Sequence, residues 1–210
     1  MNFNFQNILV LAPHTDDGEL GCGGTLSKFI KGGSKVTYAA FSTAEESVPE
    51  GLPKDILKTE VRSATKKLGV KEENLIIFNY PVRKLNFYRQ EILEELIKLR
   101  TNNYDLVLIP CLHDVHQDHA TVANEALRAF KNISILGYEL IWNNLSFNTT
   151  CFVSLEKEHI ENKVAALKEY KSQKHRDYMS DEFIFSLAKT RGVQVGKAYA
   201  EAFEVIRLMI

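Results

Sequence analysis

The chain has 210 residues and a formal net charge of −1, with 45% hydrophobic and 25% charged residues. This composition is typical of a globular protein and argues against disorder. The near-zero net charge gives no electrostatic reason to expect nucleic acid or an anionic membrane surface as a partner. We expect a single domain over residues 1–210, since α/β domains commonly reach this size.

The cysteines Cys22, Cys111 and Cys151 are far apart and form no CxxC pair. They indicate neither a disulfide framework nor a cysteine zinc site, and they fit a reducing cytoplasm best. The first residues lack the basic segment and cleavage signal of a secretory peptide. No apolar run approaches the roughly 20 residues that span a bilayer. We therefore expect a cytoplasmic protein without a membrane span.

The N-terminal region is predicted to form a strand, a helix and a second strand. Residues 8–12 form an apolar run ended by Pro13, which predicts a strand buried on both faces. Residues 18–31 predict a helix that stops at a Gly-Gly pair, and residues 35–42 predict a second strand. The small residues early in this helix are Gly21, Gly23, Gly24 and Thr25. We expect them to let the helix pack closely against the sheet.

Amphipathic helices and short apolar strands alternate through the rest of the chain. Residues 43–53 form a polar loop that could cover a site at the sheet edge. The predicted helices are 54–68, 91–99, about 120–130, 160–170 and 181–190. The predicted strands are 75–78 and 106–110, both buried, then 137–142, 151–155 and an edge strand within 202–208, with a turn at Arg191-Gly192. This alternation predicts an α/β fold, a Rossmann-like doubly wound, mostly parallel sheet with helices on both faces.

Polar side chains with metal-ligand chemistry follow the first and the fourth predicted strands. His14, Asp16 and Asp17 come directly after the first strand, and His116 and His119 come after the fourth. In an open parallel sheet, ligands bind in the crevice at the carboxyl ends of the strands. We therefore expect the two loops to form one site.

These residue types alone leave several kinds of site open. The acids could simply cap the following helix. A receiver-like domain binds magnesium with such acids, but it needs an acceptor aspartate after the third strand, where Asn79 and Tyr80 stand. The spacing of His14 and Asp16 also matches an iron oxygenase, whose chemistry usually occurs in a small β-barrel. A catalytic zinc takes three such ligands and keeps one position open for water.

Two motifs resemble one enzyme family. Residues 13–25 read Pro-His-Thr-Asp-Asp-Gly-Glu-Leu-Gly-Cys-Gly-Gly-Thr and resemble the HPDDE…GGT signature of the zinc-dependent deacetylases of the PIG-L/LmbE-like (N-acetylglucosaminyl deacetylase) family. Residues 114–119 read Asp-Val-His-Gln-Asp-His and resemble its second signature, DxHPDH. Looser similarity covers residues 64–70, 163–173 and 199–203. The resemblance thus extends over most of the chain.

The resemblance implies a metal-dependent hydrolase. The implied metal ligands are His14, Asp17 and His119, which would hold Zn²⁺ or another divalent metal such as Fe²⁺. The expected reaction removes an N-acetyl group from an amino sugar or a related small N-acyl substrate of the N-acetylglucosamine type. The alternative is a non-catalytic α/β module that binds a metal or a sugar. We expect a small amino-sugar substrate as the partner, and the chain could form a homo-oligomer.

The resemblance also implies roles for three catalytic residues. Asp16 would be the general base, taking a proton from water and returning it to the leaving amine. A protonated His116 would face the substrate carbonyl and stabilise its developing charge. Asp118 would hold the His116 ring and favour its charged form.

The sequence departs from the family pattern at three positions. Thr15 replaces the usual proline after the first histidine, and Gly18 is inserted before the glutamate. Leu57 stands where the family commonly has a substrate-contacting arginine, with Lys58 and Arg62 nearby. The chemistry implied by the resemblance is therefore better defined than the substrate.

Overall fold

The structure, a computed structural model, describes residues 5–209. The strands are β1 (Asn7–His14), β2 (Lys35–Ser42), β3 (Leu75–Ile77), β4 (Leu106–Pro110), β5 (Ser134–Tyr138), β6 (Cys151–Leu155) and β7 (Tyr199–Arg207). They form a seven-stranded sheet in the order β3-β2-β1-β4-β5-β7-β6. The strands β1 to β5 pair with one another in parallel, and β7 is antiparallel to both β5 and β6. The predicted mostly parallel α/β sheet is confirmed.

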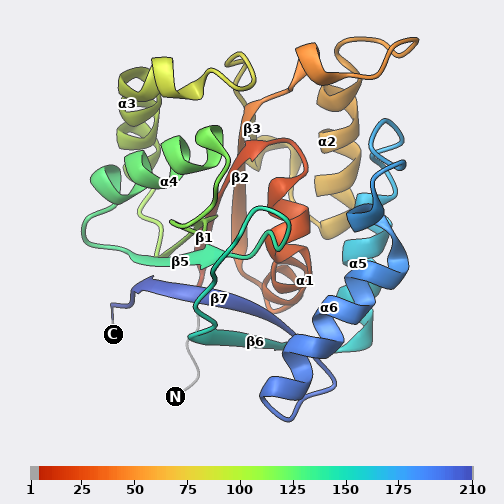
Figure 1. Cartoon of the computed structure of the whole chain (residues 1–210). Coiled ribbons are helices and arrows are strands. Elements are labelled where there is room, and N and C mark those ends of the chain that lie inside the picture. Colours follow the sequence, from red (N-terminus) through yellow and green to blue (C-terminus); the bar gives the residue numbers. More distant parts are fainter. Residues whose placement is uncertain (1–4, 210) are drawn as a thin grey trace.

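Helices cover both faces of this sheet, as Figure 1 shows. The helices are α1 (Asp17–Lys31), α2 (Ile56–Leu68), α3 (Arg89–Arg100), α4 (Gln117–Ala129), α5 (Lys157–Leu167) and α6 (Asp181–Gln194). α3 and α4 pack on one face, and the other four pack on the opposite face. Successive residues of β1 alternate between the two cores, with Ile8 and Val10 in one and Leu9 and Leu11 in the other. All four are fully buried, which explains the unbroken apolar run.

The chain reverses its direction of travel across the sheet at β1. It runs from β1 outward to β2 and β3, then returns to the other side of β1 as β4. At such a switch point the loops after the two central strands diverge to opposite faces and leave a crevice. The loops that follow β1 and β4 are the two that carry the predicted site residues.

Helix α1 lies unusually close to its neighbours. A Cβ atom on Gly21 would overlap the buried ring of Tyr138, and one on Gly18 would overlap the ring of Tyr38. The helix is also kinked at Cys22, whose φ of −144° is not helical. The expectation that small residues allow close packing here is confirmed.

The sequence-based assignments fail mainly in the last third of the chain. The strand predicted at 137–142 is β5 at 134–138, and residues 141–143 form a turn. β3 is a half-buried edge strand rather than a buried one, because only β2 pairs with it. β7 is not an edge strand, since it lies between β5 and β6.

The predicted turn at Arg191-Gly192 is also wrong, because α6 continues to Gln194. Gly192 allows the helix backbone to lie close to residues 197–199. A Cβ atom on Gly192 would lie 2.8 Å from the carbonyl oxygen of Lys197 and from the Cα atom of Tyr199. The glycine therefore lets the helix pack against the start of β7.

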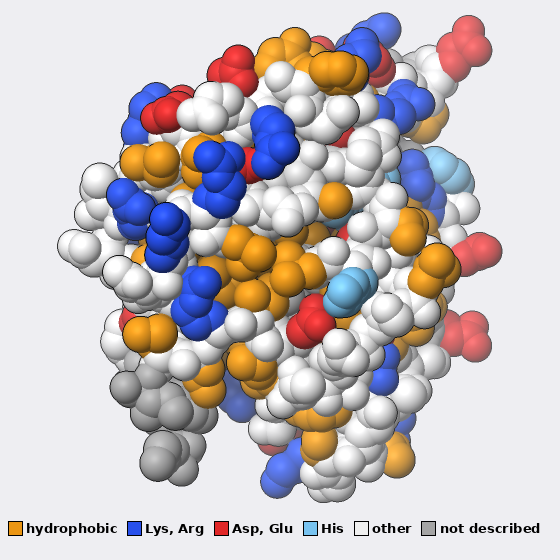
Figure 2. Space-filling view, turned by 60° about the vertical axis from the view of Figure 1, so that its left-hand side comes forward, with side chains coloured by type: hydrophobic (Ala, Val, Ile, Leu, Met, Phe, Trp, Pro, Cys, Tyr) orange, Lys and Arg blue, Asp and Glu red, His pale blue; other side chains and the backbone are white. Residues whose placement is uncertain are grey.

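The surface combines both charge signs with scattered apolar side chains. Figure 2 brings the α3 and α4 side of the molecule forward and shows hydrophobic side chains at its centre, with Lys and Arg side chains beside them. Within residues 5–209, no helix is long and apolar enough to cross a membrane. The cysteines Cys22, Cys111 and Cys151 are all free thiols.

Candidate active site

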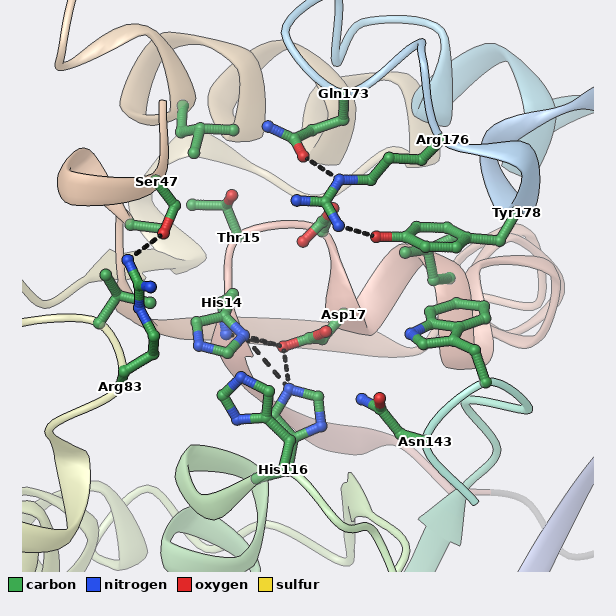
Figure 3. Close-up of a pocket in the computed structure, with 17 residues that line it drawn as sticks. His14, Thr15, Asp17, Ser47, Arg83, His116, Asn143, Gln173, Arg176 and Tyr178 are labelled. Carbon is green, nitrogen blue, oxygen red and sulfur yellow. Dashed lines mark hydrogen bonds and ion pairs between the residues drawn. The ribbon is translucent and has the colours of Figure 1, made fainter. Parts of the chain in front are cut away.

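A pocket of about 290 Å³ opens at the carboxyl ends of β1 and β4. Both predicted loops contribute to it: five of the six predicted site residues line the pocket, namely His14, Asp16, Asp17, His116 and His119. Figure 3 shows the histidine rings and Asp17 converging at its floor. The structure therefore brings the two loops together as expected from the topology.

Three side-chain atoms form a nearly regular triangle at the pocket floor. His14 Nδ1 and Asp17 Oδ2 are 3.2 Å apart, as are His119 Nε2 and Asp17 Oδ2. His119 Nε2 and His14 Nδ1 are also 3.2 Å apart. Ligand atoms bound to a tetrahedral metal at roughly 2.0–2.2 Å lie about 3.3 Å from one another. The donor set and its spacing therefore fit a divalent metal with an open fourth position.

A second grouping includes His116. Ligand atoms of His14, His116 and His119 all lie within 4.8 Å of one another. The Nδ1 atom of His116 accepts a hydrogen bond from the main-chain N–H of Asp118 at 3.2 Å, so only Nε2 is left for other contacts. The ligand set with Asp17 is the more compact and contains the carboxylate that divalent metals favour.

Two buried carboxylates orient the histidine rings. Asp114 Oδ2 lies 2.7 Å from His119 Nδ1, and Asp118 Oδ2 lies 3.0 Å from His14 Nε2. In each ring, the other nitrogen then points to Asp17, the arrangement in which a carboxylate fixes a metal-binding histidine. This contact of Asp114 is not predicted from the sequence, although its place in the second motif is a signal.

The carboxylate of Asp118 lies against His14 rather than against the ring of His116. Its carboxylate accepts the main-chain N–H groups of Arg83 (2.6 Å) and Leu85 (3.1 Å) besides contacting His14, and it does not hold the His116 ring. The pKa of His116 is lowered, by burial and by the neighbouring histidines, and Asp118 opposes this effect only in part. The structure thus favours a neutral His116 rather than a charged one.

The adjacent carboxylates Asp16 and Asp17 have opposite electrostatic environments. Burial raises the pKa of Asp17, but His119 and His14 outweigh burial and hold it well below its usual range. Burial and the charge of Asp17 raise the pKa of Asp16 to about 6. Burial lowers the pKa values of the two rings, yet contacts with carboxylates raise that of His14 to about 9 and that of His119 to about 10. Two carboxylates with separated pKa values suit two different tasks.

A buried hydrogen-bond network supports the loop from below. The carboxyl group of Glu19 lies between the hydroxyls of Tyr38 and Tyr170, and both hydroxyls lie within 2.9 Å of the carbonyl oxygen of Thr15. Burial raises the pKa of Glu19 to about 8, so its protonated form can donate within this network. The tyrosines come from β2 and from the loop after α5, and no sequence spacing could have linked them to Glu19.

The position of the family's arginine is apolar in this chain. Leu57 is buried and lines the pocket. Lys58 is exposed, and Arg62 is exposed and pairs with Glu72. Neither basic residue near Leu57 belongs to the pocket lining.

The amino-acid sequence matches one protein family and a relative from Escherichia coli. The sequence profile of the family described as PIG-L, GlcNAc-PI de-N-acetylase, matches residues 9–130, which include both loops. A relative from Escherichia coli K12, named uncharacterized deacetylase YaiS, is 30% identical over 174 residues. That match covers 80% of this chain and 91% of the relative.

Solved structures share the fold over nearly the whole chain. The N,N'-diacetylchitobiose deacetylase of Pyrococcus horikoshii has a TM-score of 0.79 and 22% identity, covering 97% of this chain and 84% of that one. A conserved protein of Thermus thermophilus has a TM-score of 0.81 and 25% identity, and the match covers 97% of this chain and 95% of that one. The 4-carboxy-2-hydroxymuconate hydratase GalB of Pseudomonas putida has a TM-score of 0.80 and 18% identity, covering 98% of each chain. The fold therefore occurs with more than one reaction.

Proposed function

The chain belongs to the PIG-L family, whose description is GlcNAc-PI de-N-acetylase, and on that premise we propose that it is a metal-dependent N-deacetylase acting on an amino sugar or a related small N-acyl substrate. The observation that carries the proposal is the 3.2 Å triangle of His14 Nδ1, Asp17 Oδ2 and His119 Nε2. A divalent ion, Zn²⁺ or alternatively Fe²⁺, would be held by these three atoms and would supply Lewis acidity, acidifying water and polarising the acyl carbonyl.

Asp16 is the proposed general base. Its carboxylate lines the same pocket, adjacent to a ligand, and its raised pKa of about 6 lies near neutral pH. It takes a proton from the attacking water as the water oxygen bonds to the acyl carbon. When the C–N bond breaks, Asp16 returns the proton to the amine nitrogen, and acetate and a free amine are released.

His116 is the proposed donor to the carbonyl oxygen. Because its Nδ1 accepts a main-chain hydrogen bond, the neutral ring carries its proton on Nε2. A hydrogen bond from Nε2 would strengthen as charge develops on the oxygen, and such donors contribute about 3–4 kcal/mol to transition-state stabilisation. This role replaces the protonated imidazole expected from the sequence.

The test is free-amine release from N-acetylglucosamine and N,N'-diacetylchitobiose by chain loaded with Zn²⁺ or Fe²⁺, compared with chelated chain. Asp16→Asn should keep the metal and lose about 10²–10⁴-fold in kcat, because the base is gone while the ligands remain. Asp55→Asn, at an exposed position outside the pocket lining, is the control.

A metal-loaded chain that releases no amine from any N-acetyl amino sugar would favour the non-catalytic binding module instead. Loss of the metal from Asp16→Asn would make Asp16 a ligand rather than the base.

A further inference from the structure

Two arginines outside the signature motifs reach into the pocket. Arg83 comes from the loop between β3 and α3, and Arg176 comes from the loop between α5 and α6. Figure 3 shows their guanidinium groups on either side of Thr15, above the histidine rings. No sequence motif predicts a role for either arginine.

Arg176 is held in place by a chain of hydrogen bonds. Its Nε donates to Gln173 Oε1 at 2.7 Å, and its Nη1 donates to the Tyr178 hydroxyl at 2.6 Å. Gln173 donates to Ser172 Oγ, and Ser172 donates from its main chain and its hydroxyl to Glu60 of α2. The last three side chains are all at most 5% exposed. Within residues 5–209, Nη2 of Arg176 has no hydrogen-bond partner and remains available to a ligand.

Arg83 is held in a backbone conformation that is rare for residues other than glycine. Its φ is +64°, in the left-handed region, and its main-chain N–H donates to Asp118 Oδ2 at 2.6 Å. Its Nη2 donates to Ser47 Oγ at 3.2 Å. Such a conformation costs about 1–3 kcal/mol and occurs often at functional sites. The backbone of Arg83 is thereby fixed to the carboxylate that orients His14.

Thr15 adds a buried hydroxyl without a partner. Its side chain is 1% exposed and lines the pocket, and Oγ1 makes no hydrogen bond to any described residue. Buried polar atoms are rarely left unpaired, because the lost hydration is not compensated. A ligand atom in the pocket could complete this hydrogen bond.

Neither arginine forms an ion pair with a described carboxylate, although Arg176 is near enough to Asp16 to oppose the rise in its pKa. Arg89, Arg128 and Arg191 each pair with a buried glutamate. In the described chain, by contrast, Arg83 and Arg176 form no ion pair and bond only to neutral Ser, Gln and Tyr side chains. Each guanidinium group therefore keeps donors that an anionic ligand could accept.

We propose that the substrate carries an anionic group, a phosphate or a carboxylate, which Arg83, Arg176 and the Thr15 hydroxyl bind beside the N-acyl group. Arginine suits this role, since its planar donors match both groups. The stacked rings of Trp142 and Tyr178, 4.0 Å apart, form an apolar wall of the same pocket that suits the C–H face of a sugar. This proposal rests on the deacetylase function proposed above.

The experiment compares kcat/KM for four N-acetyl amino sugars. The anionic probes are N-acetylglucosamine 1-phosphate, N-acetylglucosamine 6-phosphate and N-acetylmuramic acid, and the neutral probe is methyl N-acetylglucosaminide. At least one anionic probe should be preferred over the neutral one by about tenfold or more. Preference for a phosphate or for the carboxylate of N-acetylmuramic acid identifies the group.

Variants then assign the preference to named side chains. Arg176→Gln should reduce the ratio of anionic to neutral kcat/KM by about tenfold, mainly through KM, and Thr15→Val should reduce it less. Arg62→Gln, which replaces an exposed arginine outside the pocket, should keep the wild-type ratio. Equal loss on neutral and anionic probes in Arg176→Gln would show a structural role and overturn the proposal.

The two proposals fail in different ways. Amine release with no preference among the four probes overturns the anion site and leaves the deacetylase function standing. No amine release from any probe contradicts the deacetylase function, and the anion site is then tested by calorimetric titration of glucosamine 6-phosphate against glucosamine. Tighter binding of the phosphate by wild type, lost in Arg176→Gln, supports the site; equal binding rejects it.

Discussion

At the scale of single residues, Asp114 and Asp118 determine how the site could work without contacting a metal themselves. Each accepts a hydrogen bond from the ring nitrogen that faces away from Asp17, so His119 and His14 present their other nitrogen to the same point. Asp114 is 6% exposed and Asp118 is fully buried, so water competes little for these contacts. Both carboxylates fix a ring orientation and raise ligand basicity.

Asp114→Asn should lower the affinity for Zn²⁺ by about 10–100-fold, because the amide weakens the contact that holds the His119 ring. Competition with a chromogenic chelator measures the affinity, and the near-isosteric change preserves packing. Asp181→Asn, which removes only a surface pair with Lys168, should leave the affinity unchanged. Equal affinities for the wild type and Asp114→Asn would mean that this carboxylate does not support the metal site.

The sequence could place the histidines and acids of the two loops but not all of their partners. Adjacency of Asp118 to His116 suggested a contact, whereas the first turn of α4 directs the carboxylate to His14, 104 residues away. Arg83 and Arg176 lie in loops with no characteristic spacing. Their positions depend on tertiary packing, which local patterns do not record.

At the scale of elements, the position of the first loop depends on how closely α1 approaches the sheet. The ring of Tyr138, on β5, occupies the space that a side chain at position 21 would need, and its hydroxyl donates to the carbonyl oxygen of Leu11 on β1 at 2.9 Å. Gly21 thus lets a helix, a central strand and the strand next to β4 meet at one point. The loop of His14 and Asp17 joins β1 to this helix.

Gly21→Ala should reduce the free energy of unfolding by about 1–3 kcal/mol, because the added methyl group cannot fit beside the buried Tyr138 ring. Urea denaturation followed by circular dichroism measures this change. Gly32→Ala is the comparison variant and should cost less, since that residue has an ordinary φ of −76° and its Cβ atom would lie 3.3 Å from the carbonyl oxygen of Phe29, a tight contact but not the overlap found at Gly21. A Gly21→Ala chain as stable as the wild type would refute the close-packing account.

The errors about which strands lie at the edge of the sheet share one physical cause. The hydrophobic pattern of residues 199–207 indicates a strand but does not say which strands pair with it. The position of β7 between β5 and β6 could therefore not be predicted from the sequence. Strand pairing joins residues far apart in the chain, and burial alone does not specify partners. The parallel part was predictable because βαβ units restrict which strands can be adjacent.

At the scale of the whole molecule, the chain reverses its direction of travel across the sheet at β1, and this reversal creates the crevice. The loops after β1 and β4 determine the chemistry of the crevice. Deacetylases and a hydratase share this fold, so the arrangement of strands does not select a reaction. The strands of one sheet come from both ends of the chain, which supports our proposal that residues 1–210 form one domain. A homo-oligomer stays a prediction.

The central claim is that His14, Asp17 and His119 hold one divalent metal, and the metal content of the purified chain tests it most directly. We predict one bound metal per chain for the wild type and its loss in His119→Ala. His113→Ala is the matched control, because this histidine lies in the loop that leads into α4 but is exposed and outside the pocket lining. A folded wild-type chain that binds no divalent metal, or equal loss of metal in His113→Ala and His119→Ala, would contradict the account.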